Sequence, residues 1–252
     1  MILRDGWRLA LGTLTRIPVA PPGTVDRRVA GVAMTLAPLA AVPLGALVGA
    51  VGLLGAAAHW PPLVRGLLMV GALAWGTRLL HLDGLSDTVD GLTASTERER
   101  SLEVMRSGTA GPAGVVALTV VLGIQAVTFG ILSATWHGAV LAGAAVVLSR
   151  VALTVLCVRG VPAARPGGLG AAVAGAVPVA VAAVAWLIAT VAFFAIALVV
   201  GRESWWWLAP VGVLAAAGGW LKVCATRLGG ITGDVLGAVV ETALVLVLLS
   251  VV

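Results

Sequence analysis

The stretch PAGVVALTVVLGIQAVTFGILS, residues 112–133, contains no Asp, Glu, Lys or Arg and is long enough to cross a membrane. About 20 consecutive apolar residues span the hydrocarbon core of a bilayer as an α-helix. Further long apolar runs occur at residues 31–57, 62–80, 137–158, 176–200, 205–225 and 232–252. The pattern predicts an all-α, polytopic membrane helix bundle with about seven transmembrane helices.

The composition of the 252-residue chain also indicates that its solvent is lipid, because 60% of the residues are hydrophobic and only 11% are charged. The 33 glycines agree with a tightly packed bundle, since small residues let membrane helices approach one another closely. A membrane β-barrel is disfavoured because the runs are too long and lack a period of two. No repeat or polar linker divides the chain, so we expect one integral-membrane domain over residues 1–252.

The arginines lie mostly on one side of the predicted membrane. If the N-terminus is cytoplasmic, the outward connections hold only Arg65 and Arg202. The inward side then holds Arg4, Arg8, Arg16, Arg27, Arg28, Arg98, Arg100, Arg106, Arg159, Arg165 and Arg227. This positive-inside asymmetry explains the net charge of +5 without a nucleic-acid partner and predicts a multi-pass protein of the cytoplasmic (inner) membrane. Residues 1–30 form a cytoplasmic or interfacial segment, in which residues 6–17 suit a short helix lying at the interface.

Three aspartates stand out in the inward connection over residues 81–111, which we interpret as a cytoplasmic active-site loop. Asp83, Asp87 and Asp90 are spaced i, i+4 and i+7, so on a helix they share one face. Like charges at this spacing repel, and carboxylate oxygens select hard cations such as Mg²⁺. The alternative is a set of solvated charges at a helix end. His81 is more often a packing residue or a donor behind a metal ligand than a ligand itself.

A second acidic pair lies at the start of the last apolar run. Asp234 and Glu241 are i and i+7, which places them on one helical face with Glu241 about 10 Å deeper. A carboxylate at that depth is by default functional. Arg150 lies at comparable depth in the fourth run and is the expected partner of Glu241.

Anion-binding groups accompany these carboxylates. The arginines at the inner helix ends are Arg106, Arg150, Arg159, Arg165 and Arg227, of which Arg159 and Arg165 rank lowest as substrate contacts. The run GGITGD, residues 229–234, opens a helix whose backbone amides suit an anion, although a simple helix-entry turn explains it equally well. Gly84 and Gly91 follow two of the aspartates and would leave room for a bulky ligand.

Five segments resemble the cobalamin synthase family, the adenosylcobinamide-GDP ribazoletransferases of cobamide assembly. They are LTRIPV at 14–19, HLDGLSDTVDG at 81–91, MRSGTAGPAG at 105–114, SRVALTVLCVRGVPAARPGGLG at 149–170 and GGITGDVLGAVVE at 229–241. The segments occur in the family's order and extend over nearly the whole chain. Ser107, Gly108 and Thr109 depart from the family's pattern, which has an acidic and a basic residue in this loop.

The resemblance implies a Mg²⁺-dependent membrane enzyme that joins adenosylcobinamide-GDP to α-ribazole or its 5'-phosphate. The products would be adenosylcobalamin or its phosphate, and GMP. It also implies residue roles: Asp83, Asp87, Asp90 and Asp234 would be catalytic and bind metal. The substrate-binding set would be Arg16, His81, Arg106, Arg150, Arg227, Gly230, Gly233 and Glu241.

Two other functions compete with this one. A membrane phosphotransferase of the CDP-alcohol type also uses spaced aspartates at a Mg²⁺ site, but the residues after Asp87, TVDGLTASTERER, lack its arrangement. An ion-coupled transporter would use Glu241 and Arg150 as a path, but its two related halves are not visible in the sequence. The lipid bilayer is an expected partner in every case, and a homo-oligomer is left open.

Overall fold

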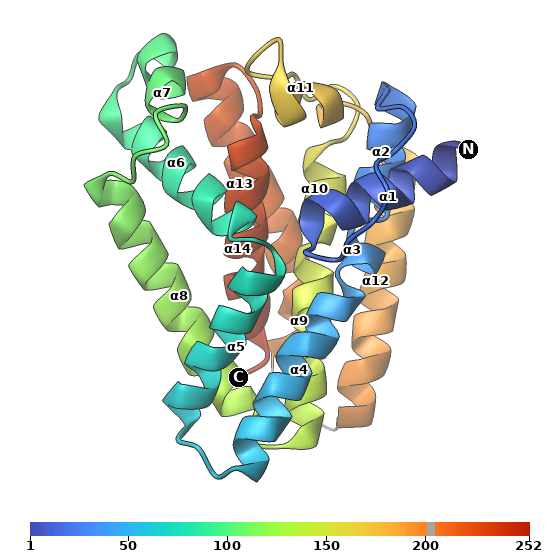
Figure 1. Cartoon of the computed structure of the whole chain (residues 1–252), viewed down its shortest axis with the longest axis vertical. Coiled ribbons are helices and arrows are strands. Elements are labelled where there is room, and N and C mark those ends of the chain that lie inside the picture. Colours follow the sequence, from blue (N-terminus) through green and yellow to red (C-terminus); the bar gives the residue numbers. More distant parts are fainter. Residues whose placement is uncertain (201–204) are drawn as a thin grey trace.

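The computed structural model describes residues 1–200 and 205–252, which form a bundle of long helices (Figure 1). Within these described residues, six helical stretches are long and apolar enough to cross a membrane, and a bent helix pair would be a seventh span if it counts as one. The six are Ala37–Ala57, Pro112–Leu132, Trp136–Leu156, Val179–Val199, Trp205–Leu228 and Gly233–Ser250. The predicted all-α membrane bundle is therefore confirmed.

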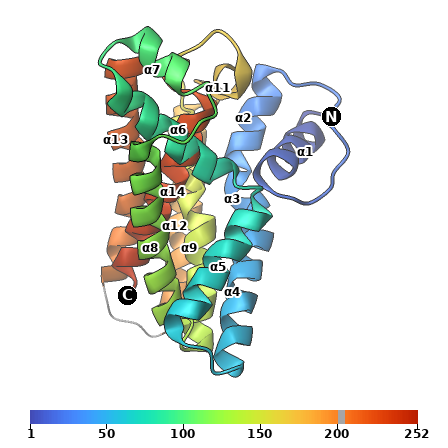
Figure 2. The same ribbon diagram turned by 60° about the vertical axis from the view of Figure 1, so that its left-hand side comes forward.

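The N-terminal third of the chain contains α1 (Ile2–Leu14), α2 (Arg27–Thr35), α3 (Ala37–Ala40) and α4 (Val42–Ala57). Pro38 and Pro43 lie in the first turns of α3 and α4, where a missing N–H is tolerated, and they mark the breaks between these helices. Helix α1 lies across the side of the bundle (Figure 2). It buries Leu11 and Leu14 but exposes Trp7, and its location at a membrane interface stays a prediction.

The second apolar run of the sequence is not one straight helix. It consists of α5 (Pro62–Gly76) and the start of α6 (Leu80–Ala94), and the two helices are bent by 92°. Arg78 and Leu79 adopt left-handed φ angles of 56° and 60° at the bend. The Arg78 guanidinium donates hydrogen bonds to the carbonyl oxygens of Gly12 and Thr13, which fixes the bend against the end of α1.

The remaining helices complete the bundle around α14 (Gly233–Ser250), which packs against α6, α8, α9 and α13. They are α7 (Arg98–Val104), α8 (Pro112–Leu132), α9 (Trp136–Ser149), α10 (Val151–Leu156), α11 (Gly168–Val173), α12 (Val179–Val200), the 3-10 turn η1 (Trp205–Leu208) and α13 (Ala209–Leu228). Because α14 is surrounded on several sides, its polar residues are held inside the protein rather than in lipid.

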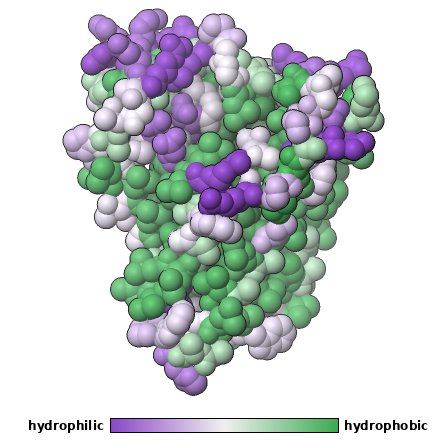
Figure 3. Space-filling view, in the orientation of Figure 1, coloured by the Kyte–Doolittle hydropathy of each residue, from purple (hydrophilic) through white to green (hydrophobic). Residues whose placement is uncertain are grey.

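Hydrophilic side chains gather at one end of the molecule, where α6, α7 and α11 lie, and the sides of the bundle below are mainly hydrophobic (Figures 1 and 3). Helix α6 therefore lies at the polar end of the bundle. Of the two outward arginines, Arg202 is outside the described residues. Arg65 is buried in α5, where it donates a hydrogen bond to the Gly130 carbonyl at 3.2 Å.

Candidate active site

Two glycines let α6 and α14 cross in direct contact. A Cβ on Gly84 would lie 2.5 Å from the carbonyl oxygen of Asp234, and a Cβ on Gly237 would lie 2.6 Å from that of His81. The space expected beside Gly84 for a ligand is therefore filled by α14, and the space beside Gly91 is filled by Met105. The crossing places the aspartates of α6 beside the first turn of α14.

The carboxylates of Asp83, Asp87 and Asp234 gather at this crossing. Asp87 is buried to 9% exposure and interacts electrostatically with both of the others, while Asp83 is exposed to solvent. The Asp234 Oδ2 atom accepts a hydrogen bond from the Thr232 hydroxyl at 3.1 Å and lies 3.6 Å from Arg165 Nη2. Asp83, Asp87 and Asp234 are thus near enough to interact electrostatically, but among the described residues no three such side chains converge into a metal site.

Asp90 is placed differently from these three carboxylates. Its Oδ2 accepts a hydrogen bond from the Gly111 N–H at 2.7 Å, and its Oδ1 accepts one from the Gly114 N–H at 2.8 Å. These groups belong to the first turn of α8, whose N–H groups have no partner within the helix. Neither glycine has room for a Cβ beside the carboxylate. Asp90 therefore anchors the start of α8. This contact explains why residues 111 and 114 are glycines.

Arg165 is the arginine that the structure places closest to the carboxylates, although the sequence analysis ranks it low. Burial lowers the pKa of its guanidinium from the ordinary value, Asp234 and Asp87 oppose this shift, and Arg106 adds to it. An arginine remains protonated in proteins. Arg165 and the exposed Arg106 thus form a cationic pair beside the acidic group, which suits binding of an anionic substrate.

Arg227 and Arg16 make other contacts. The Arg227 guanidinium donates hydrogen bonds to the carbonyl oxygens of Leu92 and Ser95 at 3.0 and 2.7 Å, and so holds the C-terminal end of α6. The Arg16 guanidinium lies 4.8 Å from the centre of the Trp75 ring, near the α5–α6 bend. Within the described part of the chain, neither arginine forms an ion pair with the aspartates.

The glycine run before α14 forms a helix-entry turn. Gly230 has a φ of 155°, and a Cβ there would collide with the Pro162 carbonyl. The Ile231 N–H donates a hydrogen bond to this same carbonyl at 3.0 Å. This bond joins the connection that contains Pro162 to the turn that precedes α14. Gly233 is the first residue of α14, and the Thr232 hydroxyl caps the helix by accepting a hydrogen bond from the Val235 N–H.

A buried polar network lies behind the crossing. Glu241 and Arg150 are 3% and 0% exposed, and they interact electrostatically without forming a direct ion pair among the described residues. Gln125 Nε2 donates a hydrogen bond to Glu241 Oε2 at 2.7 Å, and His81 Nδ1 lies 3.8 Å from Glu241 Oε1. The sequence analysis missed Gln125. It could have been noticed as a single amide side chain within the apolar run 112–133. Arg150 donates to the Ser149 hydroxyl at 2.8 Å.

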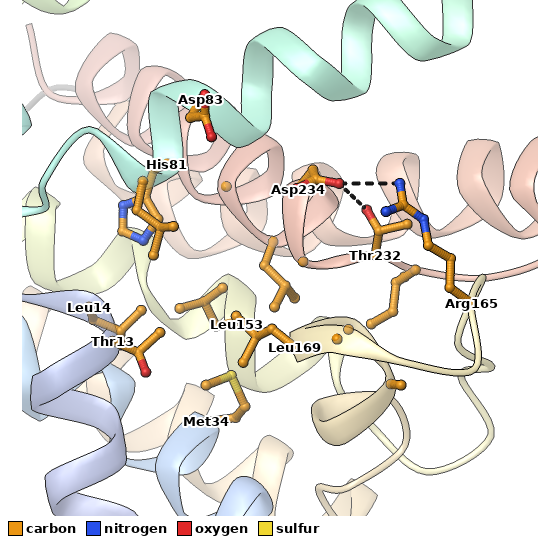
Figure 4. A pocket seen from close by; sticks show the side chains of 18 of the residues that line it. Thr13, Leu14, Met34, His81, Asp83, Leu153, Arg165, Leu169, Thr232 and Asp234 are labelled. Carbon is orange, nitrogen blue, oxygen red and sulfur yellow. Dashed lines mark hydrogen bonds and ion pairs between the residues drawn. The ribbon is translucent and has the colours of Figure 1, made fainter. Parts of the chain in front are cut away.

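A cavity of about 230 Å³ opens beside the aspartates, between α1, α2, α6, α10, α11 and α14 (Figure 4). Asp83, His81 and Asp234 belong to its lining, together with Thr232 and Arg165. Arg150 and Glu241 are not among the described residues that line it. Carboxylates can hold a metal ion, and a guanidinium can bind phosphate oxygens. Together with a cavity for an acceptor, these groups suit the transfer of a phosphoryl group.

The fold and the site together define an integral-membrane transferase whose polar groups lie at one end of a helical bundle. The family model described as cobalamin-5-phosphate synthase matches residues 6–252, and the chain belongs to this family of enzymes of cobalamin assembly.

Curated relatives support the same membership. The chain is 51% identical over 248 residues to the adenosylcobinamide-GDP ribazoletransferase of Nocardioides sp. (strain ATCC BAA-499 / JS614), and the match covers 98% of each chain. It is 36% identical to the enzyme of that name from Frankia casuarinae, over 93% of this chain and 89% of the relative. No solved structure matches the chain. The resemblance found in the sequence is confirmed, and the CDP-alcohol and transporter alternatives gain no support.

Proposed function

We propose that this enzyme transfers the adenosylcobinamide phosphate moiety of adenosylcobinamide-GDP to α-ribazole or α-ribazole 5'-phosphate. The products are adenosylcobalamin or its 5'-phosphate, and GMP. The observation that carries the proposal is the crossing of α6 over α14, which gathers Asp83, Asp87 and Asp234 beside Arg165 at the edge of a cavity. The names of the curated relatives supply the substrates.

The donor set of this site suits Mg²⁺. Among the described residues, no three His, Cys, Asp or Glu side chains converge closely enough to hold a metal by themselves. Mg²⁺ is commonly held by only one or two carboxylates, with water and substrate phosphate oxygens as the other ligands. Asp87 and Asp234 are the residues that would hold it, because both oxygens of Asp90 accept backbone hydrogen bonds and Asp83 is left to accept a proton. Bound there, Mg²⁺ would neutralise charge on the diphosphate.

The protein's own side chains account for the other requirements of the transfer. The 5'-hydroxyl oxygen of the acceptor forms a bond to the phosphorus on the cobinamide side of the diphosphate. The bond from this phosphorus to the bridging oxygen breaks, and GMP departs with that oxygen. Arg165 and Arg106 attract the phosphate oxygens. The Asp83 carboxylate lines the cavity and has no side-chain hydrogen-bond partner within the described residues, so it is the group that we assign to accept the hydroxyl proton.

We assign the site to the cytoplasmic side of the inner membrane. The connections that carry most of the arginines, including residues 81–111 and 159–175, lie at the polar end of the bundle with α6, α7 and α11. The positive-inside rule favours a cytoplasmic location for this end. A nucleotide-linked donor and a nucleoside acceptor would reach the site directly from the cytoplasm.

The experiment that tests this function uses the purified protein in lipid with adenosylcobinamide-GDP, α-ribazole and Mg²⁺. GMP release and the corrinoid product are followed by chromatography for the parent and for Asp87→Asn. Glu99→Gln, which alters an exposed carboxylate of α7, is the matched control. We expect product from the parent and the control but little from Asp87→Asn. Absence of product from a folded, Mg²⁺-supplied parent would refute the proposal.

A further inference from the structure

The cavity beside the aspartates has two chemically different walls. In Figure 4, Asp83, Asp234, Thr232 and Arg165 lie along one side, and Met34, Leu153 and Leu169 lie along the other. Met34 and Leu153 are each 1% exposed, so the apolar wall is part of the protein core. An occupant of this cavity would need an apolar body and a polar end that faces the carboxylates.

His81 is a buried polar residue at the edge of the same cavity. Its side chain lines the cavity and is 2% exposed, yet neither ring nitrogen has a hydrogen-bond partner among the described residues. Buried polar groups in folded proteins nearly always have a partner. Glu241 Oε1 lies 3.8 Å from Nδ1, and the Glu241 carboxylate accepts a hydrogen bond from Gln125. The imidazole thus borders the cavity, but both of its nitrogens are buried and do not open into it.

The size of the cavity restricts what it can hold. Pockets that enclose whole drug-sized ligands usually measure about 300–1,000 Å³. A cavity of about 230 Å³ is too small for a corrinoid macrocycle but matches a bicyclic aromatic ring with part of a sugar. The corrinoid of the donor must therefore lie elsewhere, which leaves the guanine of the donor and the base of the acceptor as occupants.

The apolar wall discriminates between these two bases. Guanine carries an amino group, a carbonyl and a ring N–H, which would lie unpaired against methionine and leucine side chains, and unpaired buried polar groups are strongly unfavourable. The base of α-ribazole is a methylated benzimidazole, whose edge carries methyl groups instead. Its burial against Met34, Leu153 and Leu169 is favourable.

We propose that the cavity between α1, α2, α6, α10, α11 and α14 is the subsite for the acceptor nucleoside, with the benzimidazole against the apolar wall and the ribose beside His81 and the aspartates. The inference rests on the proposed function and adds the location of the acceptor. The 5'-hydroxyl then lies at the polar wall, where Asp83 and Asp234 face the cavity. The diphosphate donor approaches the same carboxylates from outside the cavity, next to Arg165 and Arg106.

Two neighbouring alanines of α11 allow a matched test. Ala171 lines the cavity and Ala172 does not, and both are half-buried. Ala171→Phe would place a ring in the cavity, whereas Ala172→Phe adds the same ring on the same helix outside it. Leu169→Ala provides a second change, which removes part of the apolar wall and so enlarges the cavity.

Binding of α-ribazole and of GMP is measured by calorimetry on each protein in lipid, without donor, and the KM values of both substrates are measured where turnover occurs. We expect Ala171→Phe to weaken α-ribazole binding at least about fivefold, which corresponds to overpacking by 1 kcal/mol or more, with GMP binding and the donor KM unchanged. Leu169→Ala should also weaken the binding of α-ribazole. Ala172→Phe should leave the binding of both α-ribazole and GMP unchanged.

The possible outcomes separate the two proposals. Weaker GMP binding or a raised donor KM in Ala171→Phe, with α-ribazole unaffected, would assign the cavity to the donor and overturn the inference. An unchanged affinity for α-ribazole in both cavity variants would also overturn it. If the parent forms no product but binds α-ribazole, and Ala171→Phe loses that binding, the transferase proposal fails while the acceptor subsite stands.

Discussion

Gly84 of α6 packs directly on the backbone of Asp234 in α14, where even a methyl group would lie 2.5 Å from a carbonyl oxygen. This contact joins two segments that are 150 positions apart in the chain. It sets the distance between the Asp87 and Asp234 carboxylates, because each stands within one turn of the contact. The active site therefore depends on a residue that has no functional group of its own.

Substitution of Gly84 by alanine should separate these carboxylates. We expect Gly84→Ala to lower the free energy of unfolding by about 1–3 kcal/mol, since the added methyl forces α6 away from α14. Transfer activity should fall more than tenfold. Gly71→Ala is the matched control, because nothing lies within 4 Å of a Cβ at that position of α5. Thermal unfolding and GMP release measure both effects, and equal behaviour of the two variants would contradict the role given to Gly84.

The Asp90 carboxylate should behave as a structural anchor rather than a metal ligand. Asp90→Asn replaces one acceptor oxygen with an NH₂ group that faces a backbone N–H of α8, so stability should fall by about 0.5–2 kcal/mol, as for loss of a helix cap. The Mg²⁺ concentration for half-maximal activity should stay unchanged.

The same substitution at Asp87 should give the opposite pattern. Asp87→Asn is expected to raise the Mg²⁺ requirement, because it removes a proposed ligand, and to leave the melting temperature close to that of the parent. Mg²⁺ titrations and melting curves for the two variants provide the comparison. A raised Mg²⁺ requirement in Asp90→Asn would return Asp90 to the set of metal ligands.

The spans and the acidic face could be predicted from the sequence because both are local properties. Run length and polarity define a transmembrane helix, and a spacing of i, i+4 and i+7 is enough to align Asp83, Asp87 and Asp90. The bend between α5 and α6 could not be predicted in this way. Its left-handed residues are Arg78 and Leu79, and a leucine gives no sign of such a conformation.

Long-range contacts explain why the roles of single residues were harder to predict. Asp90 has the same spacing as its neighbours, but its partners Gly111 and Gly114 lie 21 and 24 residues away. Arg165 and Arg227 are equally basic in the sequence. Only the folding of the inward connections places Arg165 beside Asp234 and Arg227 on the carbonyls that end α6.

Arg165 and Arg227 should therefore have separable effects. Arg165→Ala is expected to raise the KM of adenosylcobinamide-GDP roughly ten- to a hundredfold, since a contact to a charged partner contributes about 1.5–3 kcal/mol. Arg227→Ala should leave this KM near the parent value and lower the melting temperature, because it releases the end of α6. Steady-state kinetics with the donor varied, alongside thermal unfolding, checks both. The reverse assignment would follow if Arg227→Ala alone raised the donor KM.

The amide of Gln125 should be required for stability rather than for metal or donor binding. Gln125→Leu leaves the buried Glu241 Oε2 atom without its donor, and an unsatisfied buried group of this kind costs about 1–3 kcal/mol. The substitution keeps α8 apolar, so membrane insertion should be unaffected. Thr119→Val is the matched control, because it removes an exposed hydroxyl from the same helix. Unfolding in detergent measures the difference, and a melting temperature of Gln125→Leu equal to that of Thr119→Val would show that the amide does not support Glu241.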